Sequence, residues 1–494
     1  MNYQRLLLTL FFLGLCLTVK ADYNFNPRCI EAYNAIFDLR LNDARAIIAE
    51  EKKLDPQNGI TVLLDNYLDY FSLLTSDNKG EYQRLLKANR SDRIDAVESN
   101  DDNTPWCLYT RAEIYLQWGL LKGRFGDYMS SASDLKKARN LLNDNEEKFP
   151  GFLPDQKSLA LINVVFGALP TKLKTAARFL GMEGNVQTGV SELERLREQI
   201  VNTKYSFYSD ELIFFLCYMD IDVLHNKNNF NKLMGYLTGM DNKSMLKAYL
   251  KGYIAAKTAH NDEAIAYLQA IPHSAQYLGL PLVDYFLACA KLCRMDTDTY
   301  VFFVKYINEY KGENFIKDSY LKLAYFYLLK NDQAKYAYYL KLARTKGYDV
   351  DEKDKQALKE ANDVPLNYDL IKTRLYFDGG YYSKGLAQLA DKKESDFPLL
   401  RDKIMYNYYM GRLYDRTTKY NDAISWYQKA INLGKNTSYY FSANAALSTG
   451  QIYEHIKDFN QAANYYKLVL TMHSHEYQSS IDEEAKDGLQ RINR

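Results

Sequence analysis

The sequence predicts an all-α protein in which helical hairpins follow one another to form a solenoid. Only 10 of the 494 residues are Pro, and a composition poor in turn residues favours helices over sheets. A chain of this length exceeds what one compact core usually holds, so several domains or a repeat array are expected. A repeat array is favoured because the pattern of residues 420–436 returns at 459–475, with small and aromatic residues at matching places.

The first residues are typical of an export signal. Arg5 precedes an apolar run that ends in a small-residue cleavage pattern before Asp22. The run is too short to span a bilayer comfortably, which disfavours an uncleaved anchor. Leu15 stands directly before Cys16, where bacterial lipoproteins carry a small residue, so lipidation is not favoured. We expect residues 1–21 to be a signal peptide, no integral membrane segment after its cleavage, and a location in the periplasm or at the outer membrane of a Gram-negative bacterium.

Charge, motifs and cysteine usage exclude several classes of function. The net charge is +1 and Lys/Arg clusters are missing, so no nucleic-acid partner is expected. Phosphate-binding loops, nucleophile elbows and zinc-protease motifs are also missing, so we expect no enzyme, no catalytic residue and no cofactor. Cys289 and Cys293 would share a helical face, as two metal ligands do, but no further His or Cys pair lies nearby. We interpret them as helix-packing thiols and expect no metal site.

Two units near the C-terminus share one register of small and aromatic residues. The positions are Gly411, Tyr414, Ala423, Tyr427 and Ala430 in the first unit and Gly450, Tyr453, Ala462, Tyr466 and Val469 in the second. The spacing resembles that of the tetratricopeptide repeat, a helix–turn–helix unit of about 34 residues, with a longer connection between the units. We expect Gly411 and Ala423 to lie where two antiparallel helices come closest, with the tyrosines beside them. Asn421 or Asp422 is expected to cap the second helix.

Weaker copies of this pattern extend over the rest of the chain. Their small residues at the third position are Ala44, Ala264, Ala334 and Gly385, with Gly252, Tyr325, Tyr338 and Tyr376 at other register positions. Amphipathic pairs without a clear signature occupy 60–96, 105–147, 207–239 and 275–311. About ten or eleven hairpins result, and the resemblance implies a right-handed α-solenoid. The final segment places Ile481, Ala485, Leu489 and Ile492 on one face and is expected to cap the array.

One stretch departs from the pattern. Residues 158–196 are first apolar, then Gly-rich, then amphipathic. They resemble a stretch in the inclusion body clearance family of tetratricopeptide proteins, with matches at Leu169, Pro170, Gly181, Gly184 and Gly189 and with Met182 in place of an aromatic residue. We interpret the stretch as a longer buried hairpin between repeat blocks. The predicted division is 1–21 signal peptide, 22–150 N-terminal hairpins, 151–205 apolar and Gly-rich insert, 206–350 central hairpins, 351–477 C-terminal repeats and 478–494 capping helix.

The resemblance also implies where a partner would bind. In tetratricopeptide repeats, fixed positions of the first helix of each unit line a concave groove. The candidate partner-binding residues at such positions are Arg374, Tyr408, Arg412, Arg416 and Gln451. Arg and Tyr are enriched at binding hot spots, so we expect these side chains to point to solvent and to bind an acidic or neutral extended segment.

Two functions remain in different classes. The favoured one is an exported scaffold that binds a protein or peptide partner in the cell envelope, without catalysis. The alternative is an outer-surface subunit that captures glycans, because some sugar-binding surface proteins of Gram-negative gut bacteria also use tetratricopeptide helices. Sugar sites stack their ligand on exposed aromatic rings, Trp above all, and the chain has only Trp106, Trp118 and Trp426.

Overall fold

The structure is a computed structural model that describes residues 23–99, 104–169, 171–179, 181–226, 228–272 and 274–493. The expected signal peptide, with Cys16, and also Pro170 lie outside these residues. The described chain is built of helices, turns and loops and contains no β-strand. Two compact units are present. Unit 1 holds the described residues up to Thr258, with Ala266–Val283 and Glu309–Gly312; unit 2 holds Ala259–Ile265, Asp284–Asn308 and the chain from Glu313 onward. The six-part division made from the sequence stays a prediction.

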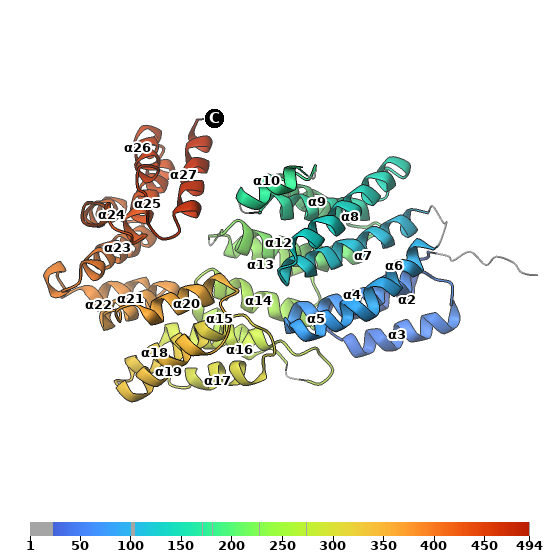
Figure 1. The fold of residues 1–494 in the computed structure, drawn as a ribbon, viewed down its shortest axis with the longest axis horizontal. Helices are drawn as coiled ribbons and strands as arrows, with labels where there is room; N and C mark the ends of the chain where they lie inside the picture. Colours follow the sequence, from blue (N-terminus) through green and yellow to red (C-terminus); the bar gives the residue numbers. More distant parts are fainter. Residues whose placement is uncertain are drawn as a thin grey trace, which may run out of the picture. The chain divides into compact units, whose positions relative to one another are not determined.

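The helices follow one another in chain order (Figure 1). Unit 1 contains α2 (Pro27–Phe37), α3 (Leu41–Leu54), α4 (Ile60–Ser76), α5 (Lys79–Leu85), α6 (Ser91–Glu98), α7 (Pro105–Arg124), α8 (Tyr128–Lys148), α9 (Pro154–Gly167), α10 (Thr171–Phe179), α11 (Val186–Gln199), α12 (Ser209–Tyr218), α13 (Phe230–Tyr236) and α14 (Met245–Lys257). The next three, α15 (Asn261–Gln269), α16 (Pro281–Arg294) and α17 (Thr299–Glu309), each include residues of both units. Unit 2 continues with α18 (Ile316–Leu329), α19 (Gln333–Thr345), α20 (Glu352–Asn362), α21 (Tyr368–Asp378), α22 (Tyr382–Leu389), α23 (Leu400–Arg416), α24 (Tyr420–Gly434), α25 (Phe441–His455), α26 (Phe459–Val469) and α27 (Gln478–Ile492).

The C-terminal hairpins have the packing that the repeat register predicts. Helix α23 packs on α24, α25 packs on α26, and each pair packs on the next. Gly411 faces the Tyr427 ring, and a Cβ atom at Gly411 would lie 2.5 Å from Tyr427 Cδ1. Gly450 faces Tyr466 in the same way. Of the remaining register residues, Ala423, Ala430 and Ala462 are fully buried and Tyr414 and Tyr453 are half-buried. The predicted all-α array of tetratricopeptide-like hairpins is confirmed.

The same contact recurs in unit 1, in a hairpin whose signature the sequence did not reveal. Helices α7 and α8 pack along their length, and a Cβ atom at Gly119 would lie 2.9 Å from Leu135 Cδ2. Ser131 replaces the second small residue, and its hydroxyl donates to the Gly119 carbonyl at 2.7 Å. Ser131 and Leu135 stand where the register has Ala and an aromatic residue, so the repeat pattern is not evident in the sequence of this hairpin.

The predicted cap of α24 is wrong. Neither Asn421 nor Asp422 caps α24, because that helix already begins at Tyr420 and its cap position, Lys419, makes no side-chain bond. The equivalent cap position of α26 is Asp458, whose carboxylate accepts from the Gln461 N–H at 3.1 Å. In α26 the capping residue is therefore the Asp directly before the aromatic Phe459, and α24 has Lys419 at that place.

The register assigned to α19 is also wrong. Ala334 is exposed and Tyr338 is 57% exposed, although both were placed in the packed interface. Leu340 and Ala343 are the buried residues of this helix. The buried face is thus shifted by two residues, which in a helix moves a side chain to the opposite side. The repeated Tyr and Ala of this segment fit two registers, and only packing against α18 selects one.

The glycines of the 158–196 stretch permit a close crossing of α9 and α11. A Cβ atom at Gly184 would lie 2.2 Å from the Asn163 carbonyl oxygen, and one at Gly189 would lie 2.7 Å from the Ala160 carbonyl oxygen. A side chain at either position would therefore push the two backbones apart. Short helix α10 lies between them in the chain. Met182, which follows α10, is buried.

Helix α27 covers the last hairpin. Ile481 and Ala485 are buried, and Gly488 lies so close to the Tyr466 ring that a Cβ atom would be 2.5 Å from Cζ. Arg491 donates to both oxygens of Glu454 at 2.9 and 3.0 Å, and Glu454 also accepts from the Tyr466 hydroxyl. An amphipathic helix with this buried face shields the apolar end of a repeat array from water.

The tight contact inside a hairpin predicts the effect of added volume. Ala423→Leu should lower the free energy of unfolding by roughly 1–3 kcal/mol, because the fully buried site has no room for the larger side chain. Ala334→Leu on the exposed face of α19 is the matched control and should stay within about 0.5 kcal/mol of wild type. Thermal and urea unfolding followed by circular dichroism measure both. Equal losses would show that the buried register is misassigned.

Candidate functional site

The candidate partner-binding residues lie on unit 2, on what we call the A-helix face. It is the side of α21, α23 and α25 that carries Arg374, Tyr408, Arg412 and Gln451. The structure brings the first three together around Tyr409, whose ring lies 5.6 Å from that of Tyr408 and within electrostatic reach of both guanidinium groups. Gln451 is exposed on α25, and Arg416, the last residue of α23, is half-buried.

The expectation that these side chains point to solvent is wrong. Tyr408 is only 5% exposed, and its ring contacts those of Tyr409, Tyr427 and Phe441 at 5.6, 6.2 and 5.6 Å. The side chain of Arg374 is 18% exposed and donates to both oxygens of Glu360 at 3.1 and 2.8 Å. A cation that is already neutralised in this way is not available to a partner without first breaking a fork-shaped pair.

Arg412 differs from Arg374 in having no ion pair, although the Asp378 carboxylate lies close enough to act on it electrostatically. Its guanidinium carbon lies 3.7 Å from the centre of the Phe377 ring and 5.4 Å from those of Tyr408 and Tyr409. No carboxylate of the described chain pairs with it and no hydrogen bond to it is formed. Stacking on aromatic faces holds a guanidinium in place but leaves its N–H donors at the edge unused. The arrangement suits recognition of an anion or a carbonyl oxygen.

A second cluster of charged residues lies in the core of unit 1, and the sequence analysis did not identify it. Lys157 on α9 is 1% exposed and donates to Glu113 on α7 at 3.1 Å and to both oxygens of Glu211 on α12 at 3.0 Å. Tyr67 on α4 donates to Glu113 at 2.9 Å, and Tyr33 on α2 donates to Glu211. The buried charges thus connect α2, α4, α7, α9 and α12.

The two carboxylates of this cluster have opposite pKa shifts. Burial disfavours the charged form of Glu113, but Lys157 and hydrogen bonds from Ser158 and Tyr67 outweigh it, so its pKa lies below the ordinary value. For Glu211, burial together with repulsion from Glu113 outweighs the attraction of Lys157, and its pKa is raised. The Lys157 ammonium thus holds Glu113 in its charged form, and Glu211 is the carboxyl of the two that takes up a proton more readily.

Asp155 is a further buried carboxyl, on the same helix as Lys157. It is fully buried, and burial raises its pKa to about 8. Asn145 donates to Oδ1 at 2.9 Å, whereas Oδ2 is buried without a hydrogen-bond partner. A carboxyl group with an unsolvated oxygen is more stable protonated than charged.

These buried groups pair across helices of unit 1 and are closed to solvent. Lys157, Glu113 and Glu211 are at most 3% exposed, so no substrate atom can reach them in this conformation. The signal for the cluster was present in the sequence as single charged residues within apolar helical stretches. Pairing Lys157 with carboxylates far away in the chain required the fold.

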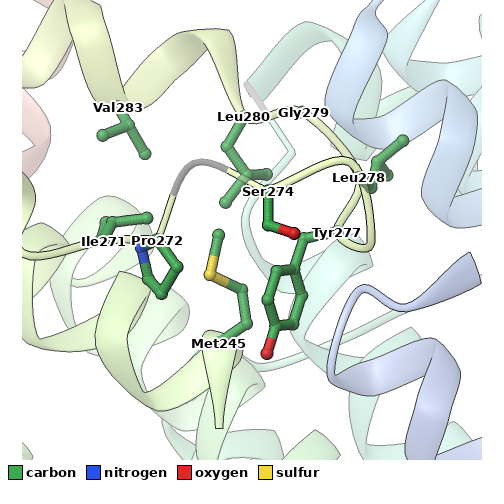
Figure 2. A pocket seen from close by; sticks show the side chains of 9 residues that line it. All are labelled: Met245, Ile271, Pro272, Ser274, Tyr277, Leu278, Gly279, Leu280 and Val283. Carbon is green, nitrogen blue, oxygen red and sulfur yellow. The ribbon is translucent and has the colours of Figure 1, made fainter. Parts of the chain in front are cut away.

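Unit 1 also has a shallow pocket of about 230 Å³ (Figure 2). Met245, at the start of α14, forms one side, and the rest is formed by Val283 of α16 and by loop residues before that helix, including Ile271, Tyr277 and Leu280. The lining contains no charged residue. The pocket therefore lacks the convergent polar groups that orient a small-molecule ligand.

Metal binding and membrane insertion find no support in the part of the chain that the structure describes. No group of three His, Cys, Asp or Glu residues there is arranged to hold a metal ion. Cys289 is half-buried and Cys293 buried, and burial raises the pKa of both thiols. No described helix is long and apolar enough to cross a bilayer.

Comparisons with known proteins add little to this description. No protein-family model and no curated protein matches the chain. Among solved structures, the anaphase-promoting complex hetero-tetramer Cut9–Hcn1 is similar over 94% of this chain and 95% of its own, at 13% sequence identity. The TM-score of that alignment is 0.25. At this TM-score the likeness supports neither fold nor function, and the tetratricopeptide-like hairpins are assigned from the contacts within each unit.

The buried ion cluster predicts an order of stability losses. Lys157→Met should lower the free energy of unfolding by about 3–5 kcal/mol, because two carboxylates would lose their only buried counter-charge. Glu113→Gln should cost more than Glu211→Gln, because Glu211 is closer to its neutral form. Urea unfolding in a Trp426→Phe background, where Trp106 and Trp118 of unit 1 report by fluorescence, measures these losses. Exposed Lys136→Met is the control and should stay near wild type.

Asp155 predicts a dependence of stability on pH. Its folded pKa, about 8, lies above its ordinary value of 3.8, so the folded protein holds a proton that the unfolded chain releases between these values. The contribution of Asp155 to stability is complete below about pH 4 and is lost as pH rises towards 8. Asp155→Asn removes this titration. Between pH 5 and pH 8.5 the free energy of unfolding of the variant should therefore rise relative to that of wild type, by on the order of 1 kcal/mol or more. Urea unfolding across this range would contradict the assignment if the two curves stayed parallel.

Proposed function

We propose that this protein is an exported scaffold that binds an extended, acidic or neutral segment of a protein partner in the cell envelope, without catalysis. Its export is inferred from the apolar run after Arg5, which lies outside the described residues. Arrays of helical hairpins present long surfaces made of side chains from successive units, and such surfaces suit partner segments of matching length.

The observation that carries the proposal is a chain of aromatic rings that begins on the A-helix face beside the Arg412 guanidinium and runs to Tyr440, before α25, and Tyr477, before α27. The Tyr408 ring contacts Phe441 at 5.6 Å, Phe441 contacts Tyr440 at 4.3 Å, and Tyr440 contacts Tyr477 at 5.3 Å. Tyr440 is half-buried and Tyr477 is 43% exposed, so the chain of rings reaches from the core to the surface. Aromatic residues and Arg are the types most enriched at energetically dominant interface positions.

We favour a protein partner over a glycan because of where the three Trp side chains lie. Trp118 is 1% exposed. Trp106 is packed between Phe25 and Phe152 at 4.9 and 4.8 Å, and Trp426 contacts Tyr406 at 5.6 Å with Lys429 over its ring. The indole rings are thus engaged within the protein. A catalytic alternative is not supported either, because the strongly perturbed carboxyls of unit 1 are buried.

Site-specific photo-crosslinking tests the proposed binding face. A benzophenone amino acid at Gln451, exposed on α25, should form a discrete adduct with one envelope protein in cells of the native host. The matched control is Lys467, exposed on α26, the second helix of the same hairpin, where no such adduct is expected. Adducts at Lys467 without one at Gln451 would place the partner elsewhere. No adduct at either position would contradict a protein-binding role for this hairpin.

A further inference from the structure

The charged groups of the A-helix face differ in whether the chain already satisfies them. On this face Arg374 is neutralised by Glu360; outside it, on α18, Lys322 is likewise neutralised by Asp318. Arg412 has no ion pair and no hydrogen bond within the described chain, although it is half-buried and packed among Phe377, Tyr408 and Tyr409. A half-buried cation without a direct ion pair or hydrogen bond loses hydration that the Asp378 carboxylate, beyond ion-pair distance, offsets only in part, so a ligand carboxylate that pairs with it directly is favoured.

The surroundings of Arg412 select the charge of that anion. Asp378, at the end of α21, is exposed and lies close enough to act electrostatically on Arg412. Arg374 is already neutralised and Asp378 offsets part of the Arg412 charge, so Arg412 is the cation among these residues that can still form a direct ion pair, and the site can balance no more than one negative charge. A monoanion matches this balance, whereas a doubly charged phosphate would require more cations.

The surroundings also select the kind of carboxylate. Sites for chain-terminal carboxylates use clusters of backbone N–H groups. The A-helix face presents the sides of α21, α23 and α25, whose N–H groups are bonded within the helices, so side chains alone face a ligand here. The fork of a guanidinium stacked on an aromatic ring suits the two oxygens of an Asp or Glu side chain.

We propose that Arg412 anchors a subsite for an internal Asp or Glu side chain of the bound segment, and that an apolar neighbour of this residue packs on the Tyr440 and Tyr477 rings. The inference rests on the proposed function and specifies the chemistry of the partner at one point of the A-helix face. The carboxylate receives hydrogen bonds from the N–H groups of Arg412, while Phe377 and Tyr409 keep the guanidinium in position. Phe377 and Tyr409 are positioning residues and do not contact the carboxylate.

A fluorinated dipeptide tests the subsite without knowledge of the natural partner. The probe is N-acetyl-(4-fluorophenylalanyl)-glutamyl amide, followed by the broadening of its ¹⁹F resonance on titration with the full-length protein. Wild type should broaden this resonance at a concentration about tenfold lower than it needs for the glutaminyl analogue, because only the former carries the anion. Inorganic phosphate and a dipeptide whose only carboxylate is C-terminal, at equal ionic strength, should compete weakly.

Variants separate a specific site from general attraction. Arg412→Gln should abolish the preference for the glutamyl probe, and Arg412→Lys, which keeps the charge but lacks the fork, should reduce it from about tenfold to about threefold. Lys435→Gln removes one exposed charge elsewhere in unit 2 and is the matched control. Circular dichroism melting confirms that each variant folds, and the Lys substitution serves if the Gln substitution does not.

Several results would overturn the proposal. They are no broadening with wild type, equal broadening by the glutamyl and glutaminyl probes, binding only at concentrations where Lys435→Gln is equally affected, or stronger competition by phosphate or by the C-terminal carboxylate. An adduct at Gln451 together with any of these results would leave a protein-binding A-helix face but remove Arg412 as its carboxylate anchor. If neither the Gln451 adduct nor the preference for the glutamyl probe is observed, the proposed function itself is wrong.

Discussion

The distance between the two helices of a hairpin depends on one contact, in which a residue without a side chain faces a large residue of the second helix. Gly411 faces Tyr427, Gly450 faces Tyr466, and in unit 1 Gly119 faces Leu135. Any side chain at the glycine would overlap the opposite residue, since a Cβ atom there would lie less than 3.0 Å from it. Interiors packed to this density transmit such displacements, so the spacing and tilt of neighbouring hairpins follow from the same contact.

The hairpin contact also fixes where polar groups of the large residue lie. The Tyr427 and Tyr466 hydroxyls donate to Asp415 and Glu454, which occupy equivalent positions on the first helices of their hairpins. Each ring therefore fills the interface while its hydroxyl reaches a carboxylate at the edge. This use of tyrosine, an apolar ring with a polar end, agrees with a composition of 44 Tyr against 23 Phe.

Unit 1 adds a different constraint, a buried ion cluster around Lys157. Burying three charges costs desolvation energy, and only close geometry with further hydrogen bonds compensates for it. Here Tyr33, Tyr67 and Ser158 supply those bonds. Unit 2 places a charge under a different condition, because Arg412 is stacked on Phe377 without a direct ion pair, and Asp378 acts on it only electrostatically. The contrast separates groups whose bonding is complete within the chain, which stabilise the fold, from a group whose bonding a ligand would complete.

The sequence by itself determined the helical class, the hairpin register of residues 404–469 and the small residues on which that register depends, because these follow from local periodicity and side-chain size. It did not determine the register of α19, where Tyr and Ala repeat in both possible phases and only burial against α18 chooses between them. Charge pairing was likewise beyond it: Arg374 and Arg412 occupy equivalent repeat positions, yet Glu360 neutralises only the first. Contacts between residues far apart in the chain, such as Lys157 with Glu113 and Glu211, exist only once the helices have packed, since no spacing in the sequence encodes which distant carboxylates an ammonium group will meet.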